Sequence, residues 1–267
     1  MHIFARPFHV RVSLFGARKD DRSSPGSRVP RPDTRYLRRK TAGLILLAGV
    51  LAMPRPSAAQ ALPSGWAARD IGSPQVAGSS TYANSKFTVA GAGSDIWGTT
   101  DQFYFVYRQL TGDGTVVARV DSLQQAHLWS KAGVMIREGL TAGAKNAYTL
   151  VSSGKGRAFQ RRTATSGTSL STIVTGAPPS WVRIQRAGST FTSSVSADGV
   201  TWQTIGSETI AMTATTYVGI AVTSHNTSRK VAAVLSSVAV TAATTPPANA
   251  APTVTITAPL AGATVSG

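Results

Sequence analysis

Short strand-like runs separated by turn residues fill the chain from Leu62 to Ala243. The runs are rich in β-branched and aromatic residues, and Gly, Asn, Asp and Ser stand between them. No amphipathic helix of about ten residues interrupts the pattern. It predicts an all-β fold, a two-sheet antiparallel sandwich over residues 62–243. The predicted strands are Lys86–Ala90, Gln102–Leu110, Thr115–Ser122, Lys131–Glu138, Ala147–Ser152, Arg157–Thr163, Trp181–Ala187, Thr190–Ala197, Thr201–Gly206, Tyr217–Ser224 and Val231–Thr241.

The stretch WSKAGVMIR, from Trp129 to Arg137, indicates how such a strand would divide its two faces. Positions 132, 134 and 136 carry Ala, Val and Ile on one side of a pleated strand. Positions 133, 135 and 137 carry Gly, Met and Arg on the other side. The first face would meet the opposing sheet, and the second would line an open hollow that holds a ligand.

The positive charge of the chain is concentrated near its N-terminus. Residues 1–61 carry 12 Lys and Arg against 3 Asp and Glu, which accounts for 9 of the net 16 positive charges. After residue 61, no run of Lys and Arg is longer than two residues. Since binding along a phosphate backbone needs a clustered basic stripe, we expect no nucleic-acid partner. Cysteine is absent, so disulfides and thiolate metal sites are excluded.

The N-terminal segment has the pattern of an export signal. Residues 1–37 are rich in Arg, Pro and Ser and are predicted to be a disordered basic leader. Residues 38–61 join a basic flank, an apolar run and the exit Ala59-Gln60-Ala61, which predicts a Sec-type signal peptide, with a buried helix as the alternative. The run is shorter than the roughly 20 residues that cross a bilayer. We therefore expect a secreted or cell-surface protein with no stable membrane anchor after signal removal.

The C-terminal segment changes in composition after residue 243. Residues 244–252 are predicted to be a Pro-rich linker. Residues 253–267 begin with TVTIT, a strand-like run, but are too few to bury a core of their own. We expect them to be the start of a truncated second β domain, so that other domains of the parent chain are partners.

Six segments carry a resemblance to a known family. They are GWAARDIG (65–72), FTVAGAGSDIWGTTDQFYFVY (87–107), GDGTVVARV (112–120), WSKAGVMIRE (129–138), SADGVTW (196–202) and YVGIAVTSHN (217–226). Together they resemble the bacterial extracellular "regulation of enolase protein" family of the concanavalin-A-like lectin/glucanase superfamily. The resemblance implies a jelly-roll sandwich that serves as an accessory module beside carbohydrate-active or adhesive domains. The tail APTVTITAPLAGATVSG resembles the first strand of bacterial Ig-like domains.

Catalytic patterns are missing from the sequence. Glycoside hydrolysis needs two carboxylates about 5–10 Å apart, and the glutamates after residue 61 are Glu138 and Glu208, far apart in the chain. The sequence contains no Gly-x-Ser-x-Gly, no His-Glu-x-x-His and no Gly-rich phosphate loop. We therefore expect no catalytic residue and no cofactor.

Four predicted strands and one loop carry the residues expected to bind a ligand. The non-core face of Tyr217–His225 is built of small residues, which leave room for a ligand, and His225 and Asn226 close it with hydrogen-bonding groups. Trp129 lies in a polar loop and would stack on a sugar ring, with a core position as the alternative. Arg119, Arg137 and Arg162, with Arg161 as the alternative to Arg162, are predicted to join this face; the alternative for each arginine is a solvated or ion-paired side chain.

Six further residues are predicted to have structural roles: Asp95, Trp97, Asp101, Asp198, Gly199 and Trp202. Asp198-Gly199 predicts a hairpin turn because both residues tolerate positive φ. The segment SADGVTW also resembles the Asp-box hairpin of sialidase propellers, which has a structural role there. Asp95 and Asp101 flank Trp97 and would hold their loop in place, with calcium ligation or catalysis as alternatives.

The sequence favours a non-catalytic exported module that binds a glycan or another cell-surface polymer. A glycoside hydrolase and a structural spacer in an adhesin remain alternatives. Facing carboxylates would favour the hydrolase, an aromatic platform beside Arg137 and His225 would favour binding, and a face filled by its own side chains would favour the spacer.

Overall fold

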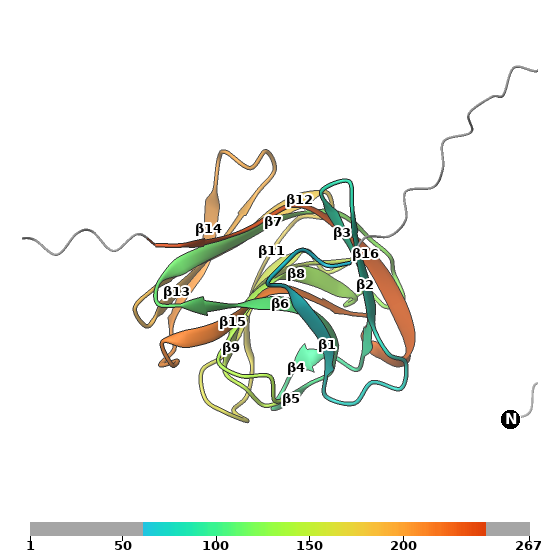
Figure 1. The fold of residues 1–267 in the computed structure, drawn as a ribbon, viewed down its shortest axis with the longest axis horizontal. Coiled ribbons are helices and arrows are strands. Elements are labelled where there is room, and N and C mark those ends of the chain that lie inside the picture. Colours follow the sequence, from blue (N-terminus) through green and yellow to red (C-terminus); the bar gives the residue numbers. More distant parts are fainter. Residues whose placement is uncertain (1–60, 244–267) are drawn as a thin grey trace, which may run out of the picture. The chain divides into compact units, whose positions relative to one another are not determined.

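A computed structural model describes residues 61–243, which form two antiparallel seven-stranded sheets and one small hairpin (Figure 1). The first sheet has the order β1 (Ala67–Ile71), β6 (Phe103–Thr111), β15 (Thr215–Thr223), β8 (Lys131–Arg137), β9 (Asn146–Ser152), β10 (Arg157–Arg162) and β11 (Leu170–Val174). The second has the order β14 (Gln203–Thr209), β13 (Thr190–Ser196), β12 (Ser180–Ala187), β7 (Gly114–Leu123), β16 (Asn226–Ala242), β3 (Lys86–Gly93) and β2 (Ser79–Ala83). The hairpin joins β4 (Ile96–Trp97) to β5 (Thr100–Asp101).

The predicted all-β jelly-roll sandwich is confirmed. Each predicted strand has a counterpart, and no helix occurs within residues 61–243. Strands β1, β2 and β11 and the short strands β4 and β5 were not predicted, and the first three lie at sheet edges. An edge strand has a neighbouring strand on one side only, and it often carries polar side chains. Apolar and polar residues therefore alternate less regularly along it. The predictions for residues 1–37, 244–252 and 253–267, and for all but the last residue of 38–61, lie outside the described residues.

The main core lies between the two sheets. From β8 it receives Ala132, Val134 and Ile136, the face that the sequence assigned to it. Strand β15 contributes Val218, Ile220 and Val222 at the same alternate spacing. Alternation along each strand thus places one apolar face of each sheet in this layer, where water is excluded.

The outer face of the first sheet is also apolar along its middle, and this differs from the prediction. Met135 on β8 packs there with Phe103, Phe105, Tyr148 and neighbours, and all are buried. Ile96 of the β4–β5 hairpin belongs to the same cluster. The hollow expected across this whole face is therefore filled by aromatic side chains, and only its end is open.

The same face shows why small residues did not leave room for a ligand. A Cβ atom added at Gly133 would lie 2.1 Å from the carbonyl oxygen of Thr149, and one added at Gly219 would lie 2.0 Å from that of Val106. Neighbouring backbone occupies the space that each missing side chain leaves.

Within residues 61–243, none of the secondary structure is a helix of the length and apolarity needed to cross a membrane.

Candidate functional site

A hollow of about 360 Å³ lies at the open end of the outer face of the first sheet. Its side chains come from β4 and the segment before it, from the loops that flank β8 and β15, and from the alternate positions of β8, β10 and β11 that face outward. We call this hollow the pocket. It is lined by Asp95, Trp97, Trp129, Lys131, Gln160, Ser171, Ile173 and His225.

The floor of the pocket is formed by Lys131, Asp95 and Gln160, and the charges of the lysine and the aspartate cancel. Lys131 is buried at the start of β8, where its Nζ donates to Gln160 Oε1 at 3.0 Å and forms an ion pair with Asp95. Burial lowers the pKa of Lys131, and the carboxylate of Asp95 acts in the opposite direction. Asp95 also accepts a 2.7 Å hydrogen bond from the main-chain N–H of Ile96, so it holds its own loop as predicted for a structural residue.

Two histidines stand at the rim. The rings of His127 and His225 stack with centroids 4.1 Å apart. His225 Nδ1 lies 3.2 Å from Asp95 Oδ2, but the orientation of the two groups makes no hydrogen bond. Among residues 61–243, this buried nitrogen and the hydroxyl of Ser171 have no hydrogen-bond partner. Buried polar atoms are nearly always paired, so two unpaired ones in one pocket indicate a place for a polar ligand or for water.

Two tryptophans and an isoleucine form the walls. The indole of Trp129 lies over Lys131, with Nζ 5.3 Å from the ring centroid. Trp97, on β4, is 41% exposed, and Ile173, on β11, is 52% exposed. Trp97 was predicted to be structural, but the structure places it on the pocket wall. An amphipathic ring beside hydrogen-bonding groups is the environment in which one side of a ligand is apolar and its edge is polar.

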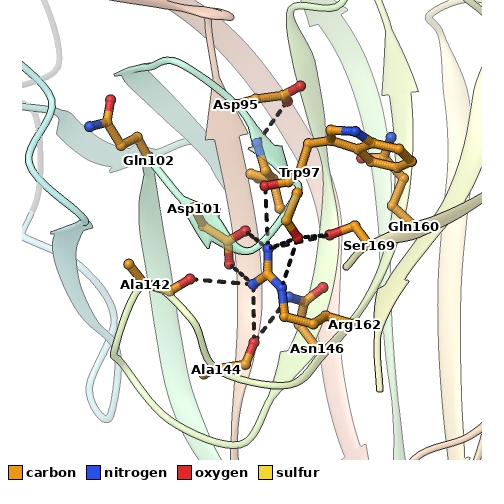
Figure 2. Close-up of polar contacts among 12 residues, drawn as sticks. Asp95, Trp97, Asp101, Gln102, Ala142, Ala144, Asn146, Gln160, Arg162 and Ser169 are labelled. Atoms are coloured by element: carbon orange, nitrogen blue, oxygen red, sulfur yellow. Dashed lines mark hydrogen bonds and ion pairs between the residues drawn. The ribbon is translucent and has the colours of Figure 1, made fainter. Parts of the chain in front are cut away.

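A buried ionic cluster fixes the wall that carries Trp97. Arg162 NH1 and NH2 donate to the two carboxylate oxygens of Asp101 at 2.8 and 2.6 Å, and its NH2 also donates to the carbonyls of Trp97 and Gly98. Figure 2 shows the guanidinium pointing at Asp101 within a ring of main-chain oxygens. Arg162 thereby ties both strands of the β4–β5 hairpin to β10.

Arg137 belongs to the same cluster and not to the pocket. Its NH1 lies 3.6 Å from Asp101 Oδ2, and its other nitrogens donate to the carbonyls of Gly139 and Thr141. Burial lowers its pKa to about 10, which leaves it charged at neutral pH. Burial also raises the pKa of Asp101, against the effects of Arg162 and Arg137.

The prediction that Arg137 and Arg162 line an open ligand site is wrong, because both side chains are 0% exposed. Arg137 also pairs with Tyr217 across β8 and β15, whereas Lys131 pairs with Thr223 at the other end of these strands. Six residues of a strand span about 20 Å, so Arg137 lies far from His225. The sequence pattern gave the correct face for Arg137 but could not show which end of the face is covered.

Two further predicted ligand residues lie away from the pocket lining. Arg119 is on β7 of the second sheet and pairs with Asp121, the alternative that its sequence context offered. Asn226 is exposed, and its Oδ1 accepts hydrogen bonds from the main-chain N–H and the hydroxyl of Ser228, both at 2.9 Å. Of the six predicted ligand residues, Trp129 and His225 are the two that the structure brings together.

The predicted turn residues lie in the β13–β14 hairpin. Asp198 Oδ1 accepts hydrogen bonds from the main-chain N–H groups of Val200 and Thr201, which hold the pKa of this carboxyl well below its usual range. Gly199 has φ +80°, and its carbonyl accepts a hydrogen bond from the indole of Trp202. These contacts are those of a structural turn.

The sequence reasoning missed four pocket residues: Lys131, Gln160, Ser171 and Ile173. Ser171 and Ile173 lie on β11, an edge strand that was not predicted. Gln160 had a usable signal, since it alternates with Ala158 and Arg162 on the outward face of a predicted strand. Lys131 also alternates with Gly133 and Met135 on the outward face, but a lysine at a strand end usually reaches into solvent.

Asp101, one of the two aspartates considered as calcium ligands, is already paired with an arginine. Both carboxylate oxygens of Asp101 are taken by Arg162, whose positive charge opposes a cation. Within the described part of the chain, no three His, Asp or Glu side chains are grouped closely enough to hold a metal ion.

The stability of the fold is expected to depend on His225 at mildly acidic pH. Burial, followed by the charges of His127 and Lys131, lowers the pKa of His225 below its usual 6.5, and Asp95 opposes this shift. The unfolded chain therefore takes up a proton before the folded protein does, so this contribution to stability is complete above pH 6.5 and is lost as the pH falls.

Urea unfolding of wild type and His225→Gln across this range measures the effect. The stability advantage of wild type should shrink below about pH 6.5. The difference at about pH 8, where the imidazole of His225 is neutral in both states, is the internal control. A constant difference at every pH would contradict the prediction.

Comparisons with known proteins establish the fold. No family model and no curated protein matches this chain. A functionally unknown protein from Saccharomyces cerevisiae has a TM-score of 0.53 at 19% identity, over 68% of this chain and 98% of that one. The GH43 protein BlXynB from Bacillus licheniformis has a TM-score of 0.44 at 15% identity, over 56% of this chain and 31% of its own length. Lectin I-B4 from Griffonia simplicifolia, in its metal-free form, has a TM-score of 0.42 at 6% identity, over 65% of this chain and 92% of the lectin. At 19% identity, the likeness to the Saccharomyces cerevisiae protein shows a shared fold alone.

Proposed function

We propose that this protein binds a neutral carbohydrate in the pocket and does not cleave it. The observation that carries the proposal is the pairing of two indole walls, Trp97 and Trp129, with a charge-balanced floor. A sugar ring has an apolar face that can stack on indole and hydroxyls that can pair with Gln160, Ser171 and His225. Because Lys131 and Asp95 neutralise each other, the floor favours an uncharged ligand over a polyanion.

The carboxylates of the pocket favour binding over hydrolysis. Within the described lining, Asp95 is the single carboxylate, and it is held by Lys131 and the main chain. Glycoside hydrolysis uses a pair of carboxyl groups on either side of the bond. The second nearby carboxyl, Asp101, is buried under Arg162. The spacer alternative would fit the filled middle of the outer face, but it does not explain the open pocket or its unpaired polar atoms.

The setting of this activity forms part of the same proposal. Export by the Sec route rests on the sequence of residues 38–61, and a place beside other domains rests on residues 244–267. Membership of the "regulation of enolase protein" family, and an Ig-like start to the tail, rest on the sequence motifs. The ligand would then be a glycan or another neutral cell-surface polymer.

The test is a glycan-array screen with the full chain, followed by calorimetry on the soluble hits. Trp129→Ala should weaken binding by about 30-fold or more, since a tryptophan anchor contributes about 2 kcal/mol. Trp202→Ala, a similar truncation in the β13–β14 turn, is the matched control and should leave affinity unchanged once folding is verified by circular dichroism.

Two results would overturn the proposal. Equal affinities of wild type and Trp129→Ala for every hit would place the binding site elsewhere. New reducing ends released from a bound oligosaccharide would show that the protein is an enzyme.

A further inference from the structure

A second hollow of about 600 Å³ adjoins the pocket. It lies between the β9–β10 turn, residues 153–156, and residues 173–177 at the end of β11 and beyond. Its walls are mostly Gly, Ser, Thr and Ala, with Lys155 at the turn. These side chains are small, in contrast to the aromatic walls of the pocket.

Ile173 is common to the two hollows. Its side chain is 52% exposed, so it forms a low apolar ridge between them. Leu128, which is 44% exposed, packs against Gly154 on the β9–β10 turn, where an added Cβ would come within 2.5 Å of the leucine methyl group. Trp97, Leu128 and Ile173 are three of the five large hydrophobic side chains that are exposed within residues 61–243. Trp97 lines the pocket, Ile173 lines both hollows, and Leu128 packs against the turn that lines the second hollow, so these exposed apolar groups form a contact surface for a ligand.

Strand β11 adds hydrogen-bonding groups beside Ile173. It is the last strand of the first sheet and pairs only with β10 within that sheet. Its free edge therefore presents main-chain N–H and C=O groups that no strand of the first sheet satisfies. An extended ligand beside this edge would meet alternating polar groups and the apolar ridge of Ile173.

We propose that the pocket and the second hollow form one groove, which holds a stretch of an extended polysaccharide rather than a single terminal sugar. This inference rests on the proposed carbohydrate-binding function and specifies its ligand class. One sugar unit occupies the pocket between the indoles, and the chain continues over Ile173 into the second hollow.

Calorimetry with oligosaccharides of increasing length tests the groove. The probes are cello-, xylo-, manno- and chito-oligosaccharides, from the monosaccharide to the hexasaccharide, titrated into the full chain. In the series that binds, affinity should rise by about tenfold or more from disaccharide to hexasaccharide, because each added unit gains contacts.

A variant that fills the second hollow isolates its contribution. Ala177→Trp places a large side chain in this hollow and should remove the gain for the hexasaccharide while leaving monosaccharide affinity unchanged. Ala187→Trp, an exposed position on the second sheet, is the matched control and should retain the gain.

The outcomes separate this inference from the proposed function. Affinity that does not change with length, or a gain that Ala177→Trp leaves intact, overturns the groove but preserves carbohydrate binding in the pocket. Failure of every oligosaccharide and every array glycan to bind overturns both.

Discussion

Asp101→Asn is expected to lower the free energy of unfolding by about 3–5 kcal/mol, because it leaves two buried guanidinium groups without their counter-charge. Asp101, Arg137 and Arg162 are each 0% exposed, so water cannot compensate for the lost carboxylate. The substitution keeps the size of the side chain, so the loss reports charge rather than packing. Urea unfolding followed by tryptophan fluorescence measures the change.

Glu208→Gln supplies the matched control for this measurement. Glu208 forms an ion pair with Arg161 at 3.1 Å, but both side chains are partly exposed. Its removal should cost less than about 1 kcal/mol, since water replaces the partner. An equally small loss for Asp101→Asn would mean that Asp101 is uncharged in the folded protein, the direction in which burial moves its pKa.

Gly133→Ala should lower the free energy of unfolding by at least about 2 kcal/mol, because the added methyl group has no space at the centre of the first sheet. Its Cβ would lie 2.1 Å from the carbonyl oxygen of Thr149 on β9. That oxygen belongs to the paired backbone, so the two strands must separate locally to admit the methyl group. Chemical unfolding of the variant measures the loss.

Gly139→Ala is the control at a permissive glycine. A Cβ there would meet only the methyl group of Ala144, at 3.9 Å, and its backbone is not in the left-handed region. This substitution should be neutral or stabilise by up to about 1 kcal/mol through the unfolded chain. If both glycine substitutions have the same effect, crowding at Gly133 is not the cause.

The buried cluster and the pocket are physically connected. Arg162 holds Asp101 of β5 and also the carbonyls of Trp97 and Gly98, so the hairpin that carries one pocket wall is anchored by the cluster. Loss of Asp101 should therefore release Trp97 as well as destabilise the core. Burying these charges has a free-energy cost. In return, the ion pairs hold in place a two-stranded hairpin that has little core of its own.

Sequence patterns predicted the sheets well because alternation is a local property. A strand such as β8 shows its two faces in the order of its residues, and the Val134 face is in the core as expected. The edge strand β11 was missed because its residues, Leu170 to Val174, are half exposed and follow no clear period. With β11 missed, Ser171 and Ile173 could not be placed in any site.

The arginines show where local pattern is insufficient. Alternation placed Arg137 and Arg162 on the outward face of the first sheet, which is where they lie. Their burial depends on Asp101 and on loop carbonyls from residues 139–144 and 97–98, which fold over that face. Alternation within one strand cannot show that loops from other parts of the chain cover its outward face.

Residue order alone was thus sufficient for the fold class, the strand faces and the Asp198-Gly199 turn. It also selected Trp129 and His225, which the structure brings together in the pocket. Tertiary packing settled which end of the outer face stays open and which polar groups meet there. The reason is that burial and ion pairing are set by segments distant in the chain: Asp95, Lys131 and Gln160 form one floor only because β8, β10 and the segment before the β4–β5 hairpin converge.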